Sequence, residues 1–511
     1  MSIVERHMGA IPRPSRTPHT RLSALAAVAA GRVDGGLDAE VTGITASSGR
    51  VIPGDLFAAL PGSTGHGAHF AAEALGAGAT AVLTDELGRA ALPSELPVLV
   101  VDDVRRRLGG VAAEVYGRPA DALAVLGVTG TSGKTTTTFL VRAGLHAAGR
   151  PSGLIGTVAT FVGGEEVKTG FTTPEAPDVH ALLAVMRERG IGTAVMEVSS
   201  HALAMGRADG ISFAVGAFTN LSRDHLDFHA DMADYFAAKS RLFDGRSRVP
   251  VVVTDDTWGR KLAARVGPGA VTVNTVGEQA TWRAVDVVVG PFGETRFRAL
   301  GPGVDVPAGC AISGRYNVAN ALLAIAILDA AGVPPMVSAP AVAVASVPGR
   351  MERIDAGQPF LAVVDYSHKP AAVEGALRAL RPLMTGRLIV VLGCGGDRDR
   401  AKRPIMGEVA ARGADLLIVT DDNPRSEDPA AIRRAMIAAA STVPAGERAE
   451  IIEIGDRAKA IARAVAAARS GDTVLVAGKG HETGQEIVGT MHPFDDREVL
   501  RAALRESQTR R

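Results

Sequence analysis

Four short apolar runs in the last third of this chain, each ending in a polar loop, limit its fold more than any other feature. The runs are Leu361–Val364, Leu388–Leu392, Leu416–Thr420 and Val474–Ala477. Alanine-rich stretches of helical character separate them. Continuous apolar runs of this length are typical of parallel strands that are buried on both faces. The pattern predicts an α/β fold with a Rossmann-like, doubly wound C-terminal domain.

The loops that follow these runs predict a site. They are Asp365–His368, Gly393–Arg398, Asp421–Arg425 and Gly478–Glu482. Open α/β sheets bind ligands at the carboxyl ends of their strands, so the four loops are expected to share one site. Loops between strands and helices are polar in general, and a single one would mean little. Charged residues in all four, with glycine or proline in three, favour the site.

Similar alternation of apolar runs and helical stretches extends toward the N-terminus, where it predicts further α/β domains. At about 150 residues per domain, 511 residues correspond to three domains. The segments Tyr116–Ala120 and Ser346–Arg350 have the composition of linkers. We therefore expect a flexible N-terminal tail and three domains, with a parallel sheet like that of P-loop ATPases in the centre. Their bounds are 1–20, 21–122, 123–347 and 348–511.

The composition excludes several classes of protein. The 55 Lys and Arg balance the 55 Asp and Glu, which argues against a nucleic-acid protein held by bulk charge. No apolar run reaches the roughly 18 residues of a membrane span. Cys310 and Cys394 alone cannot form a disulfide framework, and the first residues lack the apolar core of a secretory signal. A cytoplasmic monomer is expected.

A phosphate-binding loop opens the central domain. The strand-like run Leu123–Val128 leads into Thr129–Thr136 and then into a helical stretch, Thr137–Ala148. Such a turn presents free backbone N–H groups to an anion, while a lysine neutralises phosphate and a hydroxyl binds Mg²⁺. Val128 stands where the strict pattern has its first glycine, so this is a shortened variant, and a chance arrangement is the alternative. The residues predicted to bind ATP are Gly130, Thr131, Ser132, Gly133, Lys134, Thr135 and Thr136.

The spelling TGTSGKTT resembles the Mur ligases, which extend the peptide of the bacterial cell-wall precursor. Other motifs follow in the family's order: MEVSSH, NLSRDHLDFH, YFAAKSRLF, GRYNVANALLA, PGRMERI, DYSHKP, GCGGDRDRAKRP, DDNPR and GKGHE. The resemblance is greatest to the members that add meso-diaminopimelate to UDP-N-acetylmuramoyl-L-alanyl-D-glutamate. It implies that ATP phosphorylates the D-glutamate side-chain carboxylate, that an amine attacks the acyl phosphate, and that Mg²⁺ is needed.

Four residues are the catalytic candidates: Lys134, Glu197, His225 and Lys239. Glu197 ends an apolar run, where a carboxylate can bind Mg²⁺ beside the phosphate loop with the Thr135 hydroxyl; an exposed loop carboxylate is the alternative. The resemblance alone makes His225 a ligand of a second Mg²⁺ and makes Lys239 a carbamylated lysine that binds the metal. Taken by itself, the pattern around Lys239 predicts an amphipathic helix with this lysine on its solvated face.

The resemblance also places the adenosine of ATP. Asn317 and Asn320 lie in a helical segment whose amides can read the adenine edge, although Asn317 can instead cap that helix. Arg350 follows Pro348-Gly349 at the end of the second linker and is expected to clamp the nucleotide. Asp365 and His368 are expected near ribose and phosphate.

The precursor is expected to contact the first and central domains, at residues Ser48, Thr172, Thr173, Ser199 and Arg207. The chain departs from the family here, because Ser47-Ser48-Gly49 replaces the usual Asp-Ser-Arg. Only the serine contact carries over, which leaves the other uridine contacts open. Arg207 can also be an ordinary surface arginine.

Selection of the incoming amino acid is assigned to the DDNPR and GKGHE motifs. Lysine and meso-diaminopimelate differ by one carboxylate, which the planar, always charged fork of Arg425 can bind. Alternatively, Asn-Pro forms a turn that Arg425 merely caps. The amino-acid-binding candidates are Arg398, Asp422, Asn423, Arg425, Gly478 and Glu482. Rival functions are a related Mur or folylpolyglutamate-type amide ligase, and a P-loop nucleotide hydrolase that acts as a switch.

Overall fold

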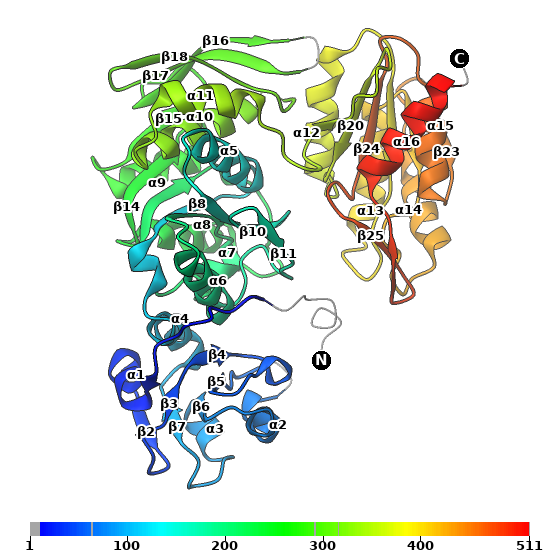
Figure 1. Cartoon of the computed structure of the whole chain (residues 1–511). Coiled ribbons are helices and arrows are strands. Elements are labelled where there is room, and N and C mark those ends of the chain that lie inside the picture. Colours follow the sequence, from blue (N-terminus) through cyan, green and yellow to red (C-terminus); the bar gives the residue numbers. More distant parts are fainter. Residues whose placement is uncertain (1–10, 63–64, 291–292, 315, 510–511) are drawn as a thin grey trace. The chain divides into compact units, whose positions relative to one another are not determined.

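The computed structural model describes residues 11–62, 65–290, 293–314 and 316–509. The chain divides into two compact units (Figure 1). The first comprises the residues up to Arg283 with Leu300–Val306 and Leu322–Ala341, and the second comprises Ala284–Ala299, Pro307–Ala321 and Val342–Arg511. Both consist of helices packed on sheets, which confirms the predicted α/β class.

The first unit begins with a five-stranded sheet of order β2-β7-β6-β5-β4. Its strands are β2 (Arg32–Asp34), β4 (Gly43–Thr45), β5 (Asp55–Ala58), β6 (Ala81–Thr84) and β7 (Val98–Val100), and β1 (Thr20–Arg21) pairs with β3 (Glu40–Val41) beside them. The helices are α1 (Leu22–Ala29), α2 (Ala71–Gly76), α3 (Glu86–Arg89) and α4 (Val104–Val115). Within the five-stranded sheet, β4, β5, β6 and β7 run parallel and β2 pairs antiparallel with β7, while the separate β1–β3 pair is antiparallel.

The prediction of a flexible N-terminal tail is wrong for residues 11–20. Ile11 is buried in the core of the first unit, and Arg13 pairs with the fully buried carboxylate of Asp55 at 2.5 Å. Ser15 donates its backbone N–H to Glu188, 2.9 Å away. These contacts fix the segment to the unit. Residues 1–10 lie outside the described residues.

The central sheet has the order β11-β10-β9-β12-β8-β13-β14-β15-β16-β17-β18, and the boundary between the units runs through the last three strands. The strands are β8 (Ala124–Thr129), β9 (Ser152–Ile155), β10 (Thr160–Val162), β11 (Glu165–Val167), β12 (Thr193–Glu197), β13 (Phe213–Phe218), β14 (Ser247–Val253), β15 (Val271–Asn274), β16 (Trp282–Val289), β17 (Thr295–Gly301) and β18 (Val304–Cys310). Seven neighbouring strands of this sheet pair in parallel, in the order β9-β12-β8-β13-β14-β15-β16. Their parallel direction brings the carboxyl ends of β8, β12 and β13 to one edge of the sheet.

Helices connect these strands. They are α5 (Lys134–Ala147), α6 (Ala176–Glu188), α7 (Ser200–Ala204), α8 (Met232–Ser240), α9 (Thr257–Val266), α10 (Tyr316–Ala330) and α11 (Pro335–Val344). Among the described residues, none of the helices combines the length and the apolar character needed to cross a bilayer.

The second unit contains a six-stranded sheet of order β19-β20-β24-β21-β22-β23. Its strands are β19 (Glu352–Arg353), β20 (Leu361–Asp365), β21 (Leu388–Leu392), β22 (Leu416–Val419), β23 (Glu450–Glu453) and β24 (Thr473–Ala477), and β25 (Gly484–Ile487) forms a hairpin with β26 (Thr490–Pro493). The four apolar runs predicted as strands are the adjacent strands β20, β24, β21 and β22, all parallel.

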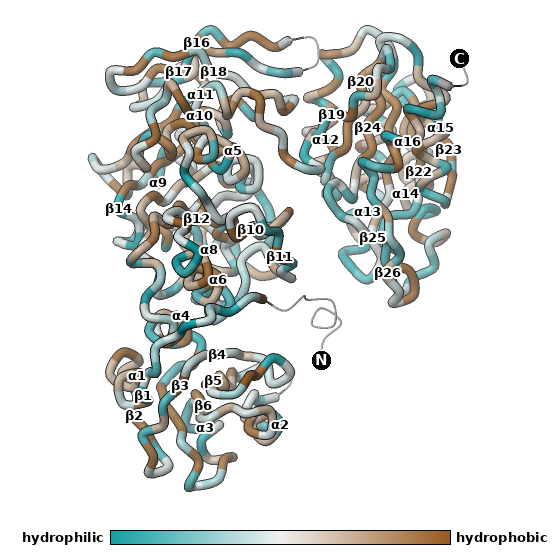
Figure 2. The backbone as a smooth tube through the Cα atoms, in the orientation of Figure 1, coloured by the Kyte–Doolittle hydropathy of each residue, from teal (hydrophilic) through white to brown (hydrophobic). Residues whose placement is uncertain are grey.

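Both faces of this sheet are covered. The helices are α12 (Pro370–Leu380), α13 (Lys402–Gly413), α14 (Pro429–Thr442), α15 (Arg457–Ala467) and α16 (Asp496–Thr509). Ala362 and Val364 of β20 pack in one core with Ile461 of α15 and Leu500 of α16, while Val363 between them is equally buried on the other face. Figure 2 shows the resulting contrast between hydrophobic strands and hydrophilic loops.

An ion pair at the start of α16 anchors that helix. Arg457 and Asp496 are both fully buried, and Arg457 Nε and Nη2 donate to the Asp496 carboxylate at 2.7 and 2.6 Å. Replacing Asp496 with alanine leaves a buried guanidinium without its carboxylate partner. The free energy of unfolding is therefore expected to fall by about 3–5 kcal/mol in urea denaturation. Glu498→Ala, which removes the exposed partner of Arg501 on the same helix, should cost under about 1 kcal/mol. Equal losses of stability in the two variants would mean that burial of the ion pair does not determine how much it stabilises the protein.

Candidate active site

The predicted phosphate loop lies between β8 and the first residue of α5, Lys134. Gly130 has φ +144°, and a Cβ there would lie 1.8 Å from Thr219 Oγ1, so only glycine fits. The N-cap residue of α5, Gly133, has a left-handed backbone. The loop therefore leads into a helix N-terminus of the kind that binds anions.

The segment after β13 holds this loop in place. Thr219 Oγ1 and Asn220 Nδ2 donate to Ser132 O at 2.7 and 3.0 Å, and Asn220 Oδ1 accepts the Ser132 N–H at 3.1 Å. Thr219 and Asn220 are not among the predicted site residues. Their position at the end of a strand next to β8 is the signal that could have identified them.

The ammonium group of Lys134 lies over the loop that precedes it. Its Nζ donates to Gly130 O at 2.9 Å and to Thr131 O at 3.0 Å. The charge is thus held beside the backbone N–H groups of the loop. Loop and lysine thus have the arrangement that a polyphosphate site requires.

Glu197 is fully buried at the end of β12 and joins two predicted sites. Its carboxylate accepts the Thr135 hydroxyl at 3.0 Å and both the N–H and the hydroxyl of Thr157, at 2.9 and 3.0 Å. Thr157 Oγ1 also contacts Thr172 Oγ1 at 3.0 Å, which links the phosphate loop to the predicted precursor site. Glu197 is therefore not an exposed loop carboxylate. Thr157, two residues beyond β9, is a contact that the sequence analysis missed.

Lys239 is buried, so the solvated face expected from its local pattern is wrong. Helix α8 turns this side chain toward the phosphate loop, where Nζ donates to Gly130 O at 2.7 Å and lies 4.7 Å from the ring centre of Tyr235. Burial, reinforced by the charge of Lys134, holds the pKa of Lys239 well below its ordinary value. A buried amine of lowered pKa is the form that reacts with CO₂.

The predicted metal ligand His225 belongs to a group of aromatic rings. Its ring lies edge-on to His201 at 4.8 Å, Nε2 is 3.4 Å from Asp224 Oδ2, and its backbone is left-handed with φ +53°. His201 in turn packs on Phe228 at 4.1 Å. No group of three or more His, Cys, Asp or Glu side chains suited to a metal occurs in the described part of the chain.

The precursor-binding candidates of the central domain lie beside Glu197. Thr173 Oγ1 donates to Glu197 O at 2.9 Å and accepts the Ser199 N–H at 3.2 Å, and Ser199 caps α7. Arg207 donates to Thr173 O at 3.2 Å and pairs with Glu175 at 2.9 Å, so it is not an ordinary surface arginine. Ser48 lies apart from this cluster, half-buried in a short 3₁₀ turn.

The remaining ATP candidates belong to the second unit. Asn317 is buried, and its Nδ2 donates to Ser313 O at 2.8 Å while its Oδ1 accepts Asn320 Nδ2 at 2.8 Å. The Asn317 amide thus holds the loop before α10. This arrangement favours the structural alternative for Asn317 and fixes the orientation of Asn320.

Arg350, Asp365 and His368 surround the end of β20. Arg350 stacks on the ring of Tyr366 at 4.6 Å, and the Asp365 carboxylate accepts the N–H groups of Met351 and Ser367 at 2.7 and 2.9 Å. Burial lowers the pKa of His368 to about 4, and its Nδ1 lies 2.8 Å from Tyr366 O. A neutral ring that donates through Nδ1 offers Nε2 as an acceptor, which suits a hydroxyl better than a phosphate.

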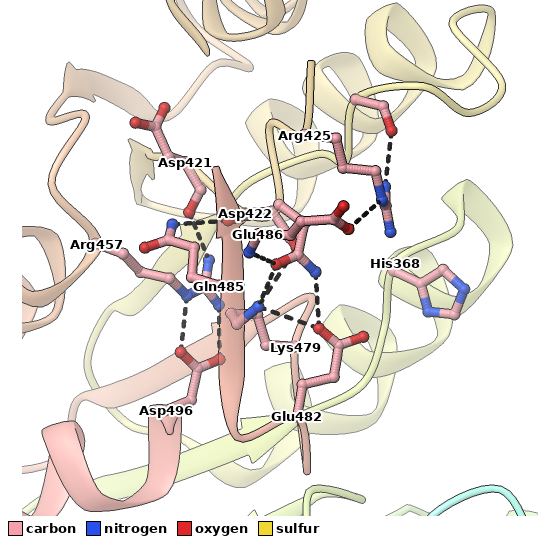
Figure 3. Close-up of polar contacts among 12 residues, drawn as sticks. His368, Asp421, Asp422, Arg425, Arg457, Lys479, Glu482, Gln485, Glu486 and Asp496 are labelled. Carbon is pink, nitrogen blue, oxygen red and sulfur yellow. Dashed lines mark hydrogen bonds and ion pairs between the residues drawn. The ribbon is translucent and has the colours of Figure 1, made fainter. Parts of the chain in front are cut away.

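The loops after β22 and β24 meet at the amino-acid candidates (Figure 3). Asn423 Nδ2 donates to Glu482 Oε2 at 2.8 Å, and the buried Lys479 donates to Asn423 Oδ1 and Glu482 Oε2 at 2.9 and 3.1 Å. Asp422 packs so close to Gly478 that a Cβ there would lie 2.6 Å from its Oδ2. Four of the predicted residues therefore share one cluster.

Arg425 lies at the edge of this cluster with a left-handed backbone, φ +52°. Its Nε donates to Glu486 Oε2 at 3.1 Å and its Nη1 to Gly396 O at 2.7 Å, while Nη2 has no acceptor among the described residues. Backbone hydrogen bonds with β25 and Val488 hold it at 3.0 and 2.7 Å. Arg398 stands apart in the exposed part of its loop.

Comparison with known proteins identifies the class of this protein with a phosphate-type loop: the chain belongs to the Mur ligase family. Models of the family's catalytic domain, middle domain and glutamate ligase domain match residues 40–116, 128–328 and 349–480. The resemblance found in the motifs is thereby confirmed, and the chain is an ATP-dependent ligase.

Individual relatives are similar along almost the whole chain. The UDP-N-acetylmuramoyl-L-alanyl-D-glutamate--2,6-diaminopimelate ligase of Streptomyces avermitilis is 54% identical over 97% of this chain and 99% of its own. The enzyme of the same name from Corynebacterium efficiens is 52% identical over 89% of this chain and 88% of its own. A solved structure of a ligase with this name has a TM-score of 0.70 at 30% identity and covers 96% of this chain and 100% of its own.

Proposed function

We propose that this chain uses ATP to add meso-diaminopimelate to the D-glutamate side-chain carboxylate of UDP-N-acetylmuramoyl-L-alanyl-D-glutamate. The observation that carries the proposal is the 54% identity over 97% of the chain to a relative named for this substrate pair. The contacts of Asn423 with Glu482 and of Arg425 with Glu486 support it, because they fix a cationic fork that can bind a carboxylate and a carboxylate that can bind an ammonium group.

The reaction needs a carboxylate to attack a polyphosphate, and both are anions. We assign Lys134 and the N–H groups of the phosphate loop to neutralising the phosphates. The precursor carboxylate then attacks the terminal phosphoryl group of ATP, and ADP leaves. The amine of the amino acid attacks the acyl phosphate, and the tetrahedral intermediate expels phosphate.

Magnesium fits the oxygen donors of this site. Buried Glu197 and Thr135 already touch each other at the start of α5, and both are hard oxygen ligands. Bound there, Mg²⁺ would stabilise developing negative charge on the phosphates. His225 and Lys239 are proposed as further ligands, the latter only as a carbamate, since a free ammonium would repel the ion.

We further propose a division of labour along the chain. Residues 21–122 with Ser48 bind the uridine end, and residues 123–347 bind ATP, the metal and the muramoyl-dipeptide through Thr172, Thr173, Ser199 and Arg207. Residues 348–511 bind the amino acid, with Arg350, Asp365 and His368 on the nucleotide. The two free, buried cysteines agree with a reducing cytoplasm, and we propose that the chain acts there as a monomer.

A phosphate-release assay tests the function. With ATP, Mg²⁺ and the UDP-precursor present, phosphate is expected only when meso-diaminopimelate is added, because nothing else accepts the acyl group. L-lysine is expected to give a rate lower by orders of magnitude, since the fork of Arg425 would then face no carboxylate. Release without any amino acid would point to a nucleotide hydrolase, and release with a different amino acid would point to another amide ligase.

A further inference from the structure

Lys479 is a fully buried lysine to which the sequence analysis gave no role. Its Nζ donates to Asn423 Oδ1 at 2.9 Å and Glu482 Oε2 at 3.1 Å, and lies 3.9 Å from Asp422 Oδ1. Burial of an isolated ammonium is costly, and here an amide and two carboxylates offset that cost. All three partners are amino-acid-binding candidates, so the lysine acts directly on their geometry.

The hydrogen bonds fix the orientation of the Asn423 amide. Lys479 Nζ and the Glu486 N–H, which lies 3.0 Å from the same atom, can only donate, so the atom between them is the amide oxygen. Both lone pairs of that oxygen are then used. The Asn423 NH₂ group therefore faces Glu482 and keeps one N–H for a substrate acceptor.

The same lysine orients Glu482. Oε2 accepts from both Lys479 and Asn423, whereas Oε1 has no hydrogen-bond partner among the described residues. Figure 3 shows Oε1 on the side of the carboxylate away from Lys479. Glu482 thus offers one free acceptor in a fixed direction, suited to an ammonium group.

We propose that Lys479 is a positioning residue for recognition of the distal amino-acid head, a role that rests on the proposed function. It locks Asn423 as a donor for a carboxylate and Glu482 as an acceptor for an ammonium. It also offsets part of the negative charge of its two carboxylate neighbours, Asp422 and Glu482. Loss of Lys479 removes one of the two donors that hold the Asn423 amide oxygen and leaves Glu482 without its ion pair.

The Lys479→Met variant tests this role. The KM for meso-diaminopimelate is expected to rise at least about 30-fold, with the KM values for ATP and the UDP-precursor within about twofold of the parent. The preference in kcat/KM for meso-diaminopimelate over L-2-aminopimelate, which keeps both carboxylates but lacks the distal ammonium, is expected to shrink. Equal losses for both substrates, or an unchanged KM, would overturn the proposal.

Two further variants separate positioning from folding. Asp472→Asn weakens the bonds of Asp472 to Arg387 at the other end of β24; it should lower stability but leave the substrate preference intact. If Lys479→Met does not fold, Glu482→Gln, which keeps the shape and removes the charge, is expected to lose the same preference, and a retained preference would refute the proposal. If the parent enzyme uses another amine, the proposed function fails. The KM of the parent and of Lys479→Met for that amine can still be compared, and this comparison decides the role of Lys479.

Discussion

Replacement of Lys239 with alanine is expected to lower kcat at least about 100-fold, because the variant loses a group that faces the phosphate loop from the protein interior. If the active form is a carbamate, the variant loses an anionic oxygen ligand of Mg²⁺ as well. A short-chain carboxylic acid supplied in solution should then restore part of the rate. The measurement is phosphate release at saturating substrates, with and without the acid.

Lys261→Ala is the matched control. Lys261 is an exposed lysine on α9 of the same unit that packs over the rings of Trp258 and Phe236 at 5.1 and 5.2 Å, and the proposed chemistry gives it no role. Its removal should leave kcat unchanged. Near-normal activity of Lys239→Ala would refute a catalytic role for Lys239. Loss of activity without rescue by the acid would leave Lys239 essential but argue against its carbamate.

Lys239 also shows where local pattern stops being informative. Amphipathic periodicity correctly predicts a helix, and α8 covers Met232–Ser240. The pattern cannot tell that the polar side of this helix faces the phosphate loop, because that contact joins residues 109 positions apart. The motif resemblance supplied the information that periodicity lacks.

The strands were predictable for a related physical reason. In a parallel sheet covered on both faces, every side chain of a strand is buried, so β20, β21, β22 and β24 read as continuous apolar runs. Strand β23 escaped prediction, because as an edge strand it exposes Glu450 and Glu453 at its two ends. Sequence therefore indicates the interior of such a sheet better than its margin.

The site residues also divide into those that the sequence predicted and those that it did not. Residues at the ends of predicted strands, such as Glu197 and Asn423, are where topology requires them to be. Lys479 and Thr157 were missed because glycine-rich or polar loops give no local sign of the long-range contacts their side chains make. Arg398 was grouped with the amino-acid candidates, yet its side chain lies in an exposed stretch while Arg403 on α13 pairs with Glu427 at 2.8 Å.

The formal net charge of zero conceals strong local fields. At the phosphate loop, the amines of Lys134 and Lys239 lie 2.9 and 2.7 Å from the same carbonyl, that of Gly130. The positive charge of Lys134 disfavours a second positive charge beside the same carbonyl, which adds to burial in lowering the pKa of Lys239. A globally neutral chain can thus bind anionic ligands through a few concentrated cations.

Replacement of Arg425 with alanine is expected to raise the KM for meso-diaminopimelate at least about 100-fold, with little change in the KM for ATP. Glu486 and Gly396 hold the guanidinium from two sides, which leaves Nη2 to bind a carboxylate without further ordering. The preference for meso-diaminopimelate over L-lysine should shrink in parallel. Steady-state kinetics with each amino acid as the varied substrate measures both effects.

Arg425→Lys distinguishes charge from shape at this position. Lysine keeps the charge but lacks the planar fork and the Nε that Glu486 holds, so it should recover only a small part of the lost affinity. Arg412→Ala serves as the control, since Arg412 is an exposed arginine of the same unit that pairs with Glu408 and Glu447. If Arg425→Ala leaves the KM for meso-diaminopimelate unchanged, Arg425 only caps its turn. Full recovery in Arg425→Lys would mean that a positive charge, and not the fork, selects the substrate carboxylate.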